Sequence, residues 1–550
     1  MDHTKRLVLI GLSGVGKSTT GRIAADLIGW DLIDTDAEIE REAGMTVPEI
    51  FSRLGEPAFR ETERAHLARA LDRENVVIAC GGGAVVDPGA WSPTLLGRLG
   101  TLIVALDADP ATSLDRMRRQ QAVEGAAVVR PLLQGDDPLA RLSTMKEQRL
   151  AAYRRASLTV VVDGATPETI GKELARTTTS VTSEPDVLLR TPSGESRIHV
   201  GSGARQMLPD AIRSTWSKCR RVWIVSDTNV APAHGEGVSS LLAEAGFDPK
   251  LLAVPAGEGS KSVEGVASLW DWMLGGGAER SDVVVALGGG VVGDLAGFAA
   301  ATTLRGIGLV QLPTSLLASV DSSVGGKTGI NHPAGKNLIG AFNQPPVVLI
   351  DPDLMRTAPS RELGSGWAEV IKHSVIQRST PGGERGDLAR ALDANVSALL
   401  RFEDPALSYI IRRNVALKAA VVEADERESG IRAFLNFGHT LGHAIEAADY
   451  SLLHGEAIAI GMRAAMLLGQ QIGTCDAATA AALDAQVTRF GLPMQSHTDW
   501  ERVRAKMSSD KKKEAGSQRW VLPLTGGGVE LRSDVPISAV ESAFQRVNSA

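Results

Sequence analysis

The stretch LVLIGLSGVGKSTTG, residues 7–21, decides the fold of the first part of this 550-residue chain. Four apolar residues typical of a buried strand run into the pattern G-x-x-x-x-G-K-S, and a helix-like segment follows. Such glycines let backbone N–H groups converge on phosphate oxygens, while the lysine reaches the β- and γ-phosphates and the serine holds Mg²⁺. A plain glycine turn is the alternative. We predict binding of ATP with Mg²⁺ through Gly11, Gly14, Gly16, Lys17, Ser18 and Thr19.

Outward from this stretch, short apolar runs alternate with amphipathic helical stretches, which is the pattern of a parallel α/β sheet. Before residue 176 the expected strands are Leu7–Ile10, Val76–Ala79, Thr101–Leu106 and Thr159–Val162. Farther on they are Val222–Val225, Val283–Leu287, Gly308–Leu312 and Val347–Ile350. After about residue 361 the strand signals stop and long Ala- and Leu-rich helical patterns follow.

This pattern predicts an α/β protein of three structural domains. We expect a P-loop kinase domain with a parallel sheet at 1–175, a Thr- and Ser-rich linker at 176–190, a Rossmann-like α/β domain at 191–360 and a mostly α-helical metal-binding domain at 361–550.

The charge and composition of the chain exclude several classes of binding partner. The net charge of −7 leaves no basic footprint for nucleic acid and no polybasic patch for a membrane. The most apolar window, Val283–Leu304, contains Asp294 and many glycines, too broken to span a bilayer. Three scattered cysteines exclude a disulfide framework. We expect a cytoplasmic enzyme that acts on small molecules, with its 58 glycines marking backbone held close to ligands.

Two further features of the first domain narrow its substrate. In DLIDTDAEIE, residues 31–40, Asp34 and Asp36 would point the same way on an extended strand end, one toward the metal and one toward a substrate hydroxyl. Helix capping or surface charge is the alternative. In EPAFRETE, Arg60 and Glu63 have i,i+3 spacing, and the strand VVIAC ends in Gly81–Gly83, where backbone can approach a small ligand.

With GLSGVGKST, the D-x-D pair, FRxxE, GGGAV, RPLL and KEQRLAAYRRAS, residues 5–172 resemble shikimate kinase. The resemblance implies that Asp34 acts through Mg²⁺ and that Arg130 and Arg149 complete the ATP site. It also implies that shikimate is bound by Asp36, Arg60, Gly81, Gly82 and Gly83. An acidic residue for vicinal hydroxyls and an arginine for a carboxylate suit a hydroxylated ring acid.

The densest signal of the second half is GIRAFLNFGHTLGHAIEAADYSLLHGEAIAIGM, residues 430–462. His439 and His443 are spaced i,i+4 on a helix and His454 follows, so three of the ten histidines fall within 16 residues. Spacing alone predicts that these three bind a metal. A helix with incidental histidines is the alternative.

The α/β part before it carries a second nucleotide signal. VVVALGGGVVGD is a buried strand with a glycine turn, which suits a pyrophosphate, and Asp227, Asn229, Glu258 and Lys261 lie at the ends of strand-like runs, where ribose and adenine contacts are common. LPTSLLASVDSSVGGKTGINHPAGKNLIGAF, residues 312–342, is too apolar for a solvated charge run. Its lysines, with Arg305 and Arg432, predict an acidic, phosphorylated substrate.

VDSSVGGKTGIN, AEVIKH, LNFGHTLGHAIE, HGEAIAIGM and MSSDKKK make residues 195–545 resemble 3-dehydroquinate synthase. The resemblance implies Zn²⁺ or Co²⁺ on Glu369, His439 and His454, with His443 left for substrate or proton transfer. One carboxylate with two imidazoles leaves open positions for a hydroxy/keto substrate. The resemblance further implies a homodimer through the C-terminal half.

The remaining residues of this second site follow from the same resemblance. The substrate set is Arg305, Asp321, Lys327, Asn337, Lys372, Lys418, Arg432 and one lysine of the DKKK run, assigned to Lys512. The NAD⁺ set is Asp227, Asn229, Glu258, Lys261, Gly289, Gly290, Asp294, Thr314, Ser315, Asp321, Lys336 and Thr357. The residues expected to act in catalysis are Lys17 in the first half and Arg305, Lys327, Asn337, Lys372 and His443 in the second.

The implied function is bifunctional. One half would phosphorylate shikimate to shikimate 3-phosphate with ATP. The other would cyclise 3-deoxy-D-arabino-heptulosonate 7-phosphate to 3-dehydroquinate, with NAD⁺ recycled and phosphate released. The alternatives are a P-loop small-molecule kinase or regulatory nucleotide module fused to another sugar-phosphate cyclase or to a metal-dependent polyol dehydrogenase. A dehydrogenase would lack the cations Arg305, Lys327 and Arg432.

Overall fold

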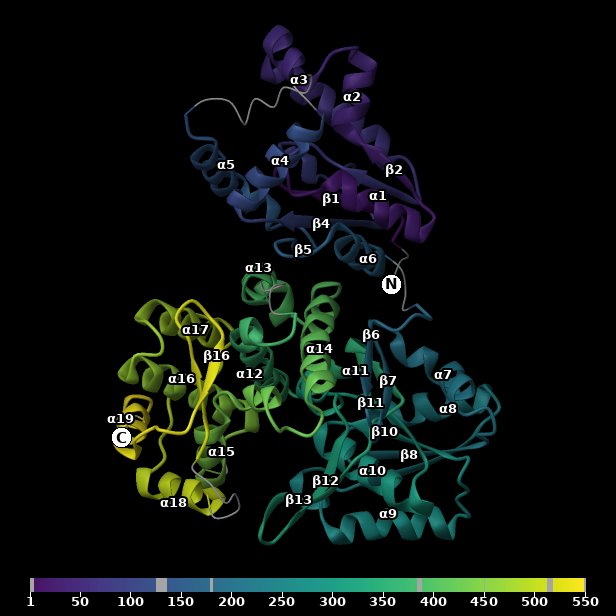
Figure 1. The fold of residues 1–550 in the computed structure, drawn as a ribbon. Helices are drawn as coiled ribbons and strands as arrows, with labels where there is room; N and C mark the ends of the chain where they lie inside the picture. The colour runs from purple at the N-terminus through teal and green to yellow at the C-terminus, as the bar shows by residue number, and fades with distance from the viewer. Residues whose placement is uncertain are drawn as a thin grey trace. The chain divides into compact units, whose positions relative to one another are not determined.

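The computed structural model describes residues 4–124, 136–178, 182–382, 388–449, 451–511 and 518–548. The chain divides into two compact units, 1–180 with 390–409 and 181–389 with 410–550 (Figure 1). Among the described helices, none combines the length and the apolar character that a bilayer crossing requires.

The first unit is built on a five-stranded parallel sheet in the order β2-β3-β1-β4-β5. Its elements are β1 (Arg6–Ile10), α1 (Lys17–Ile28), β2 (Asp31–Asp34), α2 (Thr35–Ala43), α3 (Val47–Leu71), β3 (Val76–Ala79), β4 (Thr101–Asp107), α4 (Pro110–Glu124), α5 (Pro138–Tyr153), β5 (Leu158–Val161) and α6 (Pro167–Thr178). β1 and β3 are buried along their whole length, as continuous apolar runs require when helices cover both faces of a sheet. The register Leu9↔Ala79 and Asp34↔Ala79 brings the carboxyl ends of β1, β2 and β3 to one edge.

The α/β part of the second unit has a seven-stranded sheet in the order β6-β7-β14-β11-β10-β8-β9, parallel except for the β6–β7 pair. Its elements are β6 (Val187–Thr191), β7 (Gly194–Val200), α7 (Leu208–Thr215), β8 (Arg221–Asp227), α8 (Glu236–Glu244), β9 (Asp248–Val254), α9 (Val263–Gly275), β10 (Val283–Gly288), α10 (Gly290–Thr302), β11 (Gly308–Pro313), β12 (Lys327–His332), β13 (Gly335–Phe342), β14 (Val347–Ile350) and α11 (Pro352–Met355). Strands β12 and β13 form a separate antiparallel hairpin.

From residue 360 on the chain is mostly helical, coloured green to yellow in Figure 1. This part contains α12 (Ser360–Ile376), α13 (Leu388–Leu400), α14 (Ala406–Ala424), α15 (His439–Ala448), α16 (His454–Ile472), α17 (Ala477–Arg489), α18 (Trp500–Lys511), β15 (Trp520–Pro523), β16 (Val529–Arg532) and α19 (Ile537–Arg546). Residues 390–409, most of α13 and the start of α14, belong to the first unit. Helices α15, α16, α18 and α19 share one apolar core with β15. α12 packs against α16, which brings two stretches far apart in the sequence together.

The eight expected strands are confirmed, with ends that differ by no more than two residues. The expectation of no strand after residue 361 is wrong, because β15 and β16 form a hairpin closed by Gly526–Gly528, all three at positive φ. The segment WVLP is too short to show a strand period. Within the predicted linker 176–190, α6 continues to Thr178 and β6 begins at Val187.

Two candidate active sites

The predicted phosphate loop lies between β1 and α1 with an open helix N-terminus. Gly16, at φ 98°, precedes α1 without a side-chain capping bond, so the first N–H groups of the helix remain available to an anion. Gly14 has φ 82°, and a Cβ there would lie 2.6 Å from the carbonyl oxygen of Ser113. The ammonium of Lys17 donates to the carbonyl oxygens of Gly11 and Leu12, at 3.0 Å each. Burial lowers the pKa of Lys17. This loop fits a nucleotide phosphate.

The two predicted Mg²⁺ residues of this loop and β2 are in contact, since Ser18 Oγ donates to the carboxylate of Asp34. Asp34 ends β2 and also caps α2 by accepting from the Ala37 N–H at 3.3 Å. The expectation that Asp34 and Asp36 share an extended strand end is wrong, because the chain turns into α2 at Thr35. Asp36 therefore lies on a helix, in its first turn.

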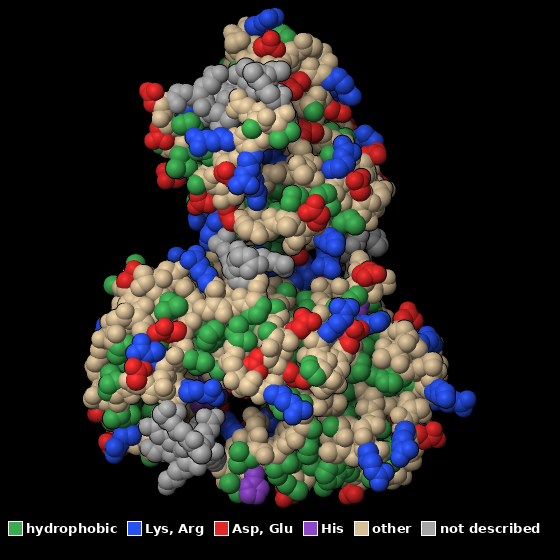
Figure 2. Space-filling view, viewed as in Figure 1, with side chains coloured by type: hydrophobic (Ala, Val, Ile, Leu, Met, Phe, Trp, Pro, Cys, Tyr) green, Lys and Arg blue, Asp and Glu red, His purple; other side chains and the backbone are tan. Residues whose placement is uncertain are grey.

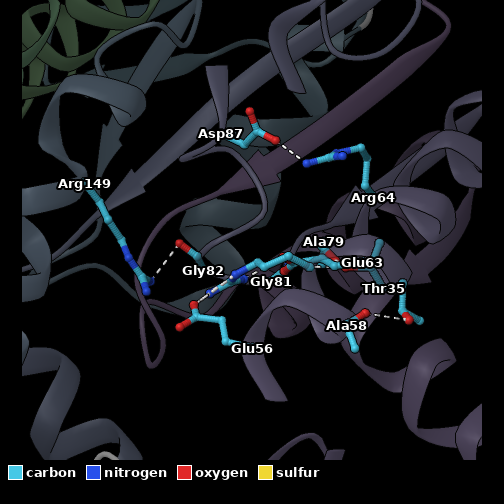
Figure 3. Close-up of polar contacts among 12 residues, drawn as sticks. Thr35, Glu56, Ala58, Glu63, Arg64, Ala79, Gly81, Gly82, Asp87 and Arg149 are labelled. Carbon is cyan, nitrogen blue, oxygen red and sulfur yellow. Dashed lines mark hydrogen bonds and ion pairs between the residues drawn. The ribbon is translucent and has the colours of Figure 1, made fainter. Parts of the chain in front are cut away.

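Carboxylates and arginines surround the glycine triplet that follows β3 (Figure 3). A Cβ at Gly81 would collide with the carboxylates of Glu63 and Asp36, and one at Gly83 would collide with the Arg60 guanidinium. Arg60 binds Glu63 Oε2 at 2.6 Å and Glu56 Oε1 at 3.0 Å. A side chain at Gly81 or Gly83 would displace these charged groups, so the two glycines leave room for charges of both signs next to the backbone.

Arg149 lies where this triplet meets the phosphate loop. Its Nη1 donates to Gly82 O at 2.8 Å, and Tyr153 donates to the same oxygen at 2.7 Å. Figure 3 shows Arg149 reaching Gly82 from one side, with Glu63 on the other side of Gly81. The resemblance implied an ATP contact for Arg149, whereas the structure brings it to the predicted shikimate end. Arg130, the other arginine assigned to ATP, lies outside the described residues.

Asp36 and Glu63 form a buried pair of carboxylates with unused oxygens. Asp36 Oδ1 and Glu63 Oε1 are buried without a hydrogen-bond partner. Burial and the neighbouring Glu63 raise the pKa of Asp36 to about 6, and burial raises that of Glu63. Glu63 is the acid of the FRxxE motif, and the sequence assigned it no role. The i,i+3 spacing with Arg60 was the signal that pointed to it.

The second candidate site lies between α12, α15 and α16 of the second unit. Glu369 is fully buried on α12, and neither of its carboxylate oxygens has a hydrogen bond of normal geometry. Its Oε1 lies 3.4 Å from Nε2 of both His439 and His454, while Lys372 forms an ion pair with it. One carboxylate and two imidazole nitrogens thus converge on one point.

The Nδ1 atoms of the two imidazoles, the nitrogens that do not face Glu369, also contact oxygen atoms of the protein. Nδ1 of His439 lies 3.1 Å from Phe437 O, and Nδ1 of His454 lies 3.0 Å from Glu446 Oε2. Donating Nδ1–H to these oxygens leaves the Nε2 lone pairs directed at Glu369, which is how histidine ligands of metals are oriented. This donor set fits a divalent metal ion of the zinc type.

His443 lies next to these ligands. The ring centroids of His439, His443 and His454 are 5.0–5.7 Å apart, and one nitrogen of each ring lies within 4.8 Å of the others. The set of three histidines predicted from spacing and the set implied by the resemblance are therefore both assembled. Burial and the two neighbouring imidazoles lower the pKa of His443 to about 3, so this ring is neutral.

Cations line the same region of the second unit, in ion pairs. Lys418 binds the side chain and carbonyl of Asp321, which lies in the turn after β11. Burial lowers the pKa of Lys418, although Asp321 opposes the shift. Lys327, at the start of β12, binds Glu428, which also accepts from Asn436 at 2.6 Å.

Arg432 is buried and donates to Gly325 O at 3.2 Å. The sequence assigned no role to Glu428, which has φ 61° in the loop after α14. It is one of four acids in EADERE, residues 423–428, and nothing in that run distinguishes it from the others. Figure 2 shows a hollow in this face of the second unit with Lys and Arg side chains beside it.

The residues predicted to bind NAD⁺ lie at the edge of the seven-stranded sheet where the carboxyl ends of the parallel strands meet. Gly289 caps α10 without a side-chain bond, and a Cβ at Gly290 would lie 3.1 Å from Ser322 Oγ. Lys261 pairs with Asp294, and Glu258 accepts from Asn331 at 2.8 Å. The open helix N-terminus and the glycine backbone fit a dinucleotide pyrophosphate.

Other predicted residues are spread along this edge. Asp227 Oδ1 accepts from the N–H groups of Asn229 and Val230, so it shapes the turn after β8. Thr314 N donates to Gly288 O, the Ser315 hydroxyl accepts from Ala318 N, and Thr357 Oγ1 lies 2.7 Å from His234 Nε2.

The hairpin β12–β13 carries Lys336, paired with Glu446 at 2.7 Å, and Asn337 at φ 57°. Arg305 is exposed at φ 70°, and no contact in the described part of the chain joins its side chain to the other predicted substrate residues. Lys512 lies outside the described residues.

Comparison with known families matches both halves. The model of shikimate kinase matches residues 13–179, that of the 3-dehydroquinate synthase N-terminal part matches 251–365, and that of its C-terminal part matches 366–513. A 3-dehydroquinate synthase of Symbiobacterium thermophilum is 42% identical over 356 residues, 63% of this chain and 97% of that protein. One from Caulobacter vibrioides is 42% identical over 354 residues, 62% of this chain and 93% of that protein.

Two solved structures are similar to the synthase half in fold. The 2-epi-5-epi-valiolone synthase of Streptomyces hygroscopicus, with NAD⁺ and Zn²⁺ bound, is 28% identical with a TM-score of 0.58, covering 64% of this chain and 96% of that one. A 2-deoxy-scyllo-inosose synthase complexed with carbaglucose-6-phosphate, NAD⁺ and Co²⁺ is 21% identical with a TM-score of 0.56, covering 67% of this chain and 100% of that one, which shows a shared fold.

Proposed function

The chain belongs to the 3-dehydroquinate synthase family and carries a shikimate kinase domain before the synthase, and we propose that two separate sets of its residues perform the two reactions. The kinase phosphorylates shikimate with ATP, and the synthase forms 3-dehydroquinate with release of phosphate. The observation that carries the assignment is the presence in one chain of the Lys17–Ser18–Asp34 phosphate loop and the Glu369–His439–His454 cluster.

In the kinase, the open N-terminus of α1 would hold the ATP phosphates, with Lys17 for the terminal phosphates and with Ser18 and Asp34 for Mg²⁺. Asp36 Oδ1, buried without a partner, accepts the hydrogen bond of a substrate hydroxyl. Arg60 and Arg149 flank the glycine triplet and hold the substrate carboxylate. Catalysis is then mainly positioning and charge neutralisation of the transferred phosphoryl group.

In the synthase, Glu369, His439 and His454 would hold Zn²⁺ or Co²⁺, which as a Lewis acid polarises a substrate oxygen. NAD⁺, when bound at the glycine edge of β10, supplies a hydride acceptor that is restored within the turnover. The substrate phosphate and carboxylate are bound by Lys327, Asn337, Arg432 and Arg305. A charged network of the same site is formed by Asp321, Lys372 and Lys418. Neutral His443 contacts the substrate beside the metal ligands.

We also propose that the protein is cytoplasmic and forms a homodimer through its C-terminal half. The domains are then 1–175, 191–360 and 361–550, with the kinase joined to the synthase through the residues around 176–190. The compact unit that begins at residue 181 supports the boundary between the kinase and the synthase.

The test uses the full chain with each substrate in turn and follows the products. Lys17→Met should abolish ATP-dependent formation of shikimate 3-phosphate, because the buried ammonium that faces the phosphates is gone. Phosphate release from the seven-carbon substrate should continue at the parent rate. Loss of both activities would refute the assignment to separate residue sets. Absence of shikimate phosphorylation in the parent would favour a regulatory nucleotide module instead.

A further inference from the structure

Glu446 joins the proposed metal site to the hairpin that carries a proposed nucleotide residue. Its Oε2 lies 3.0 Å from Nδ1 of His454, and its Oε1 accepts from Nζ of Lys336 at 2.7 Å. The three residues come from α15, α16 and β13, so one carboxylate ties the helical part of the second unit to its α/β part. Neither the sequence motifs nor the proposed mechanism assigns Glu446 a role.

The contact with His454 determines which nitrogen faces the metal. With Nδ1–H donated to Glu446, the lone pair of Nε2 is free, and this nitrogen lies 3.4 Å from Glu369 Oε1. A carboxylate partner orients the ring and increases its basicity as a ligand. At Nδ1, His439 has a neutral partner instead, the carbonyl of Phe437. The orientation of His454 therefore depends on an acidic side chain.

The position of Glu446 on its helix suits this role. It lies three residues after His443 and seven after His439, so α15 places one metal ligand, the neutral imidazole and the outer carboxylate on one face. Its side chain is only 18% exposed, whereas that of Lys336 is 56% exposed. The lysine therefore reaches inward from the hairpin surface, and its bond fixes the second oxygen of the carboxylate.

We propose that Glu446 is a positioning residue that orients His454 for the metal, and that Lys336 holds Glu446 in place. Metal binding is then coupled to the hairpin β12–β13 through the chain Lys336–Glu446–His454. The inference rests on the proposed metal ligands Glu369, His439 and His454.

The experiment measures Co²⁺ affinity of the full-length apo protein, without ATP or NAD⁺, from the visible absorption of bound Co²⁺. Glu446→Gln keeps the size of the side chain but removes its charge, and should weaken Co²⁺ binding by about 10- to 100-fold, the usual effect of losing an outer partner. Lys336→Met should weaken Co²⁺ binding less than Glu446→Gln does. The double variant should bind no more weakly than Glu446→Gln alone, because both changes act through the same carboxylate.

Glu456→Gln is the matched control. It removes the same charge from the first turn of α16, where Glu456 binds Arg361 and the Leu453 N–H instead of an imidazole, and should retain the parent affinity. Lys336→Met changes a surface side chain, so it also reports on the coupling should Glu446→Gln fail to fold.

His454→Ala separates this inference from the proposed function. Retention of the Co²⁺ band in His454→Ala would refute the metal ligands themselves. Loss of the band there, with parent affinity in Glu446→Gln, would leave the ligands intact and overturn the positioning role. Additive losses in the double variant would overturn the coupling through Lys336.

Discussion

Among single residues, buried carboxylates distinguish the two sites more sharply than any motif. Burial raises the pKa values of Asp36 and Glu63 in the first unit, even though Glu63 is paired with Arg60. Glu369 in the second unit is fully buried, but the ammonium of Lys372 holds its pKa well below the usual range against the effect of burial. The first arrangement favours accepting hydrogen bonds from hydroxyls, and the second favours a permanently charged ligand.

The raised pKa of Asp36 predicts a pH-dependent stability. Burial and Glu63 raise this pKa from 3.8 to about 6, so the fold disfavours the charged form and loses stability as the pH rises through 6. A shift of this size corresponds to roughly 3 kcal/mol. Asp36→Asn should therefore melt at a higher temperature than the parent at pH 8, and the difference should shrink toward pH 4. It should also lose shikimate phosphorylation.

The measurement is thermal unfolding of both proteins from pH 4 to pH 8. Asp26→Asn, at an exposed position of α1, removes the same charge and serves as the control. An equal difference in melting temperature at every pH would contradict the prediction, because it would indicate a change in packing instead of in titration.

At the scale of elements, the loop between α14 and α15 shows how one side chain shapes a site. Asp425 accepts from Ser429 N at 2.9 Å, from Gly430 N at 2.7 Å and from Arg432 N at 3.0 Å. Burial raises its pKa, but these bonds lower it to about 2. The loop folded around Asp425 carries Glu428 and Arg432.

Asp425→Asn should disturb this loop selectively. An amide NH₂ cannot accept the two N–H groups at Oδ2, so Arg432 is no longer held toward the substrate. We expect KM of the synthase for its phosphorylated substrate to rise about tenfold, since a lost buried hydrogen bond costs about 1–3 kcal/mol. Kinase activity should be unchanged. Steady-state phosphate release measures the effect.

Asp476→Asn provides the matched control for this loop. Asp476 caps α17 by accepting from Thr479 N at 2.8 Å, away from the proposed site. Because asparagine caps a helix about as well as aspartate does, this variant should keep the stability of the parent and show no change in KM. A similar rise in KM for both variants would contradict the assigned role of Asp425.

For the whole molecule, the two chemistries depend on different metals. The first unit offers Ser18 and Asp34, hard oxygen ligands that suit Mg²⁺, and the second offers two imidazoles with one carboxylate, which suit zinc-type ions. A chelator selective for zinc-type ions, with Mg²⁺ in excess, should abolish phosphate release by the synthase and leave shikimate phosphorylation intact. His454→Ala should reproduce this result, and both activities are measured on the same sample. An equal loss of kinase activity would contradict the separation.

Much of the fold was predictable because it depends on neighbours in the chain. The apolar run of β10, the βα alternation and the phosphate loop before Lys17 are local patterns, and all lie where the sequence placed them. The short hairpin β15–β16 was missed, because a four-residue strand has no measurable period. The turn at Thr35 also escaped prediction, so Asp36 was placed on the wrong element.

The sequence by itself determined two enzyme modules, their α/β character and most candidate residues, because motif spacing and hydrophobic period are set within a few turns of chain. The tertiary structure alone decided that Glu369 meets His439 and His454, that Arg149 reaches Gly82, and that Glu446 lies between His454 and Lys336. These contacts join elements far apart in the chain, and a single carboxylate carries no pattern of its own. Only the packing of helices and hairpin brings each acid to its partner.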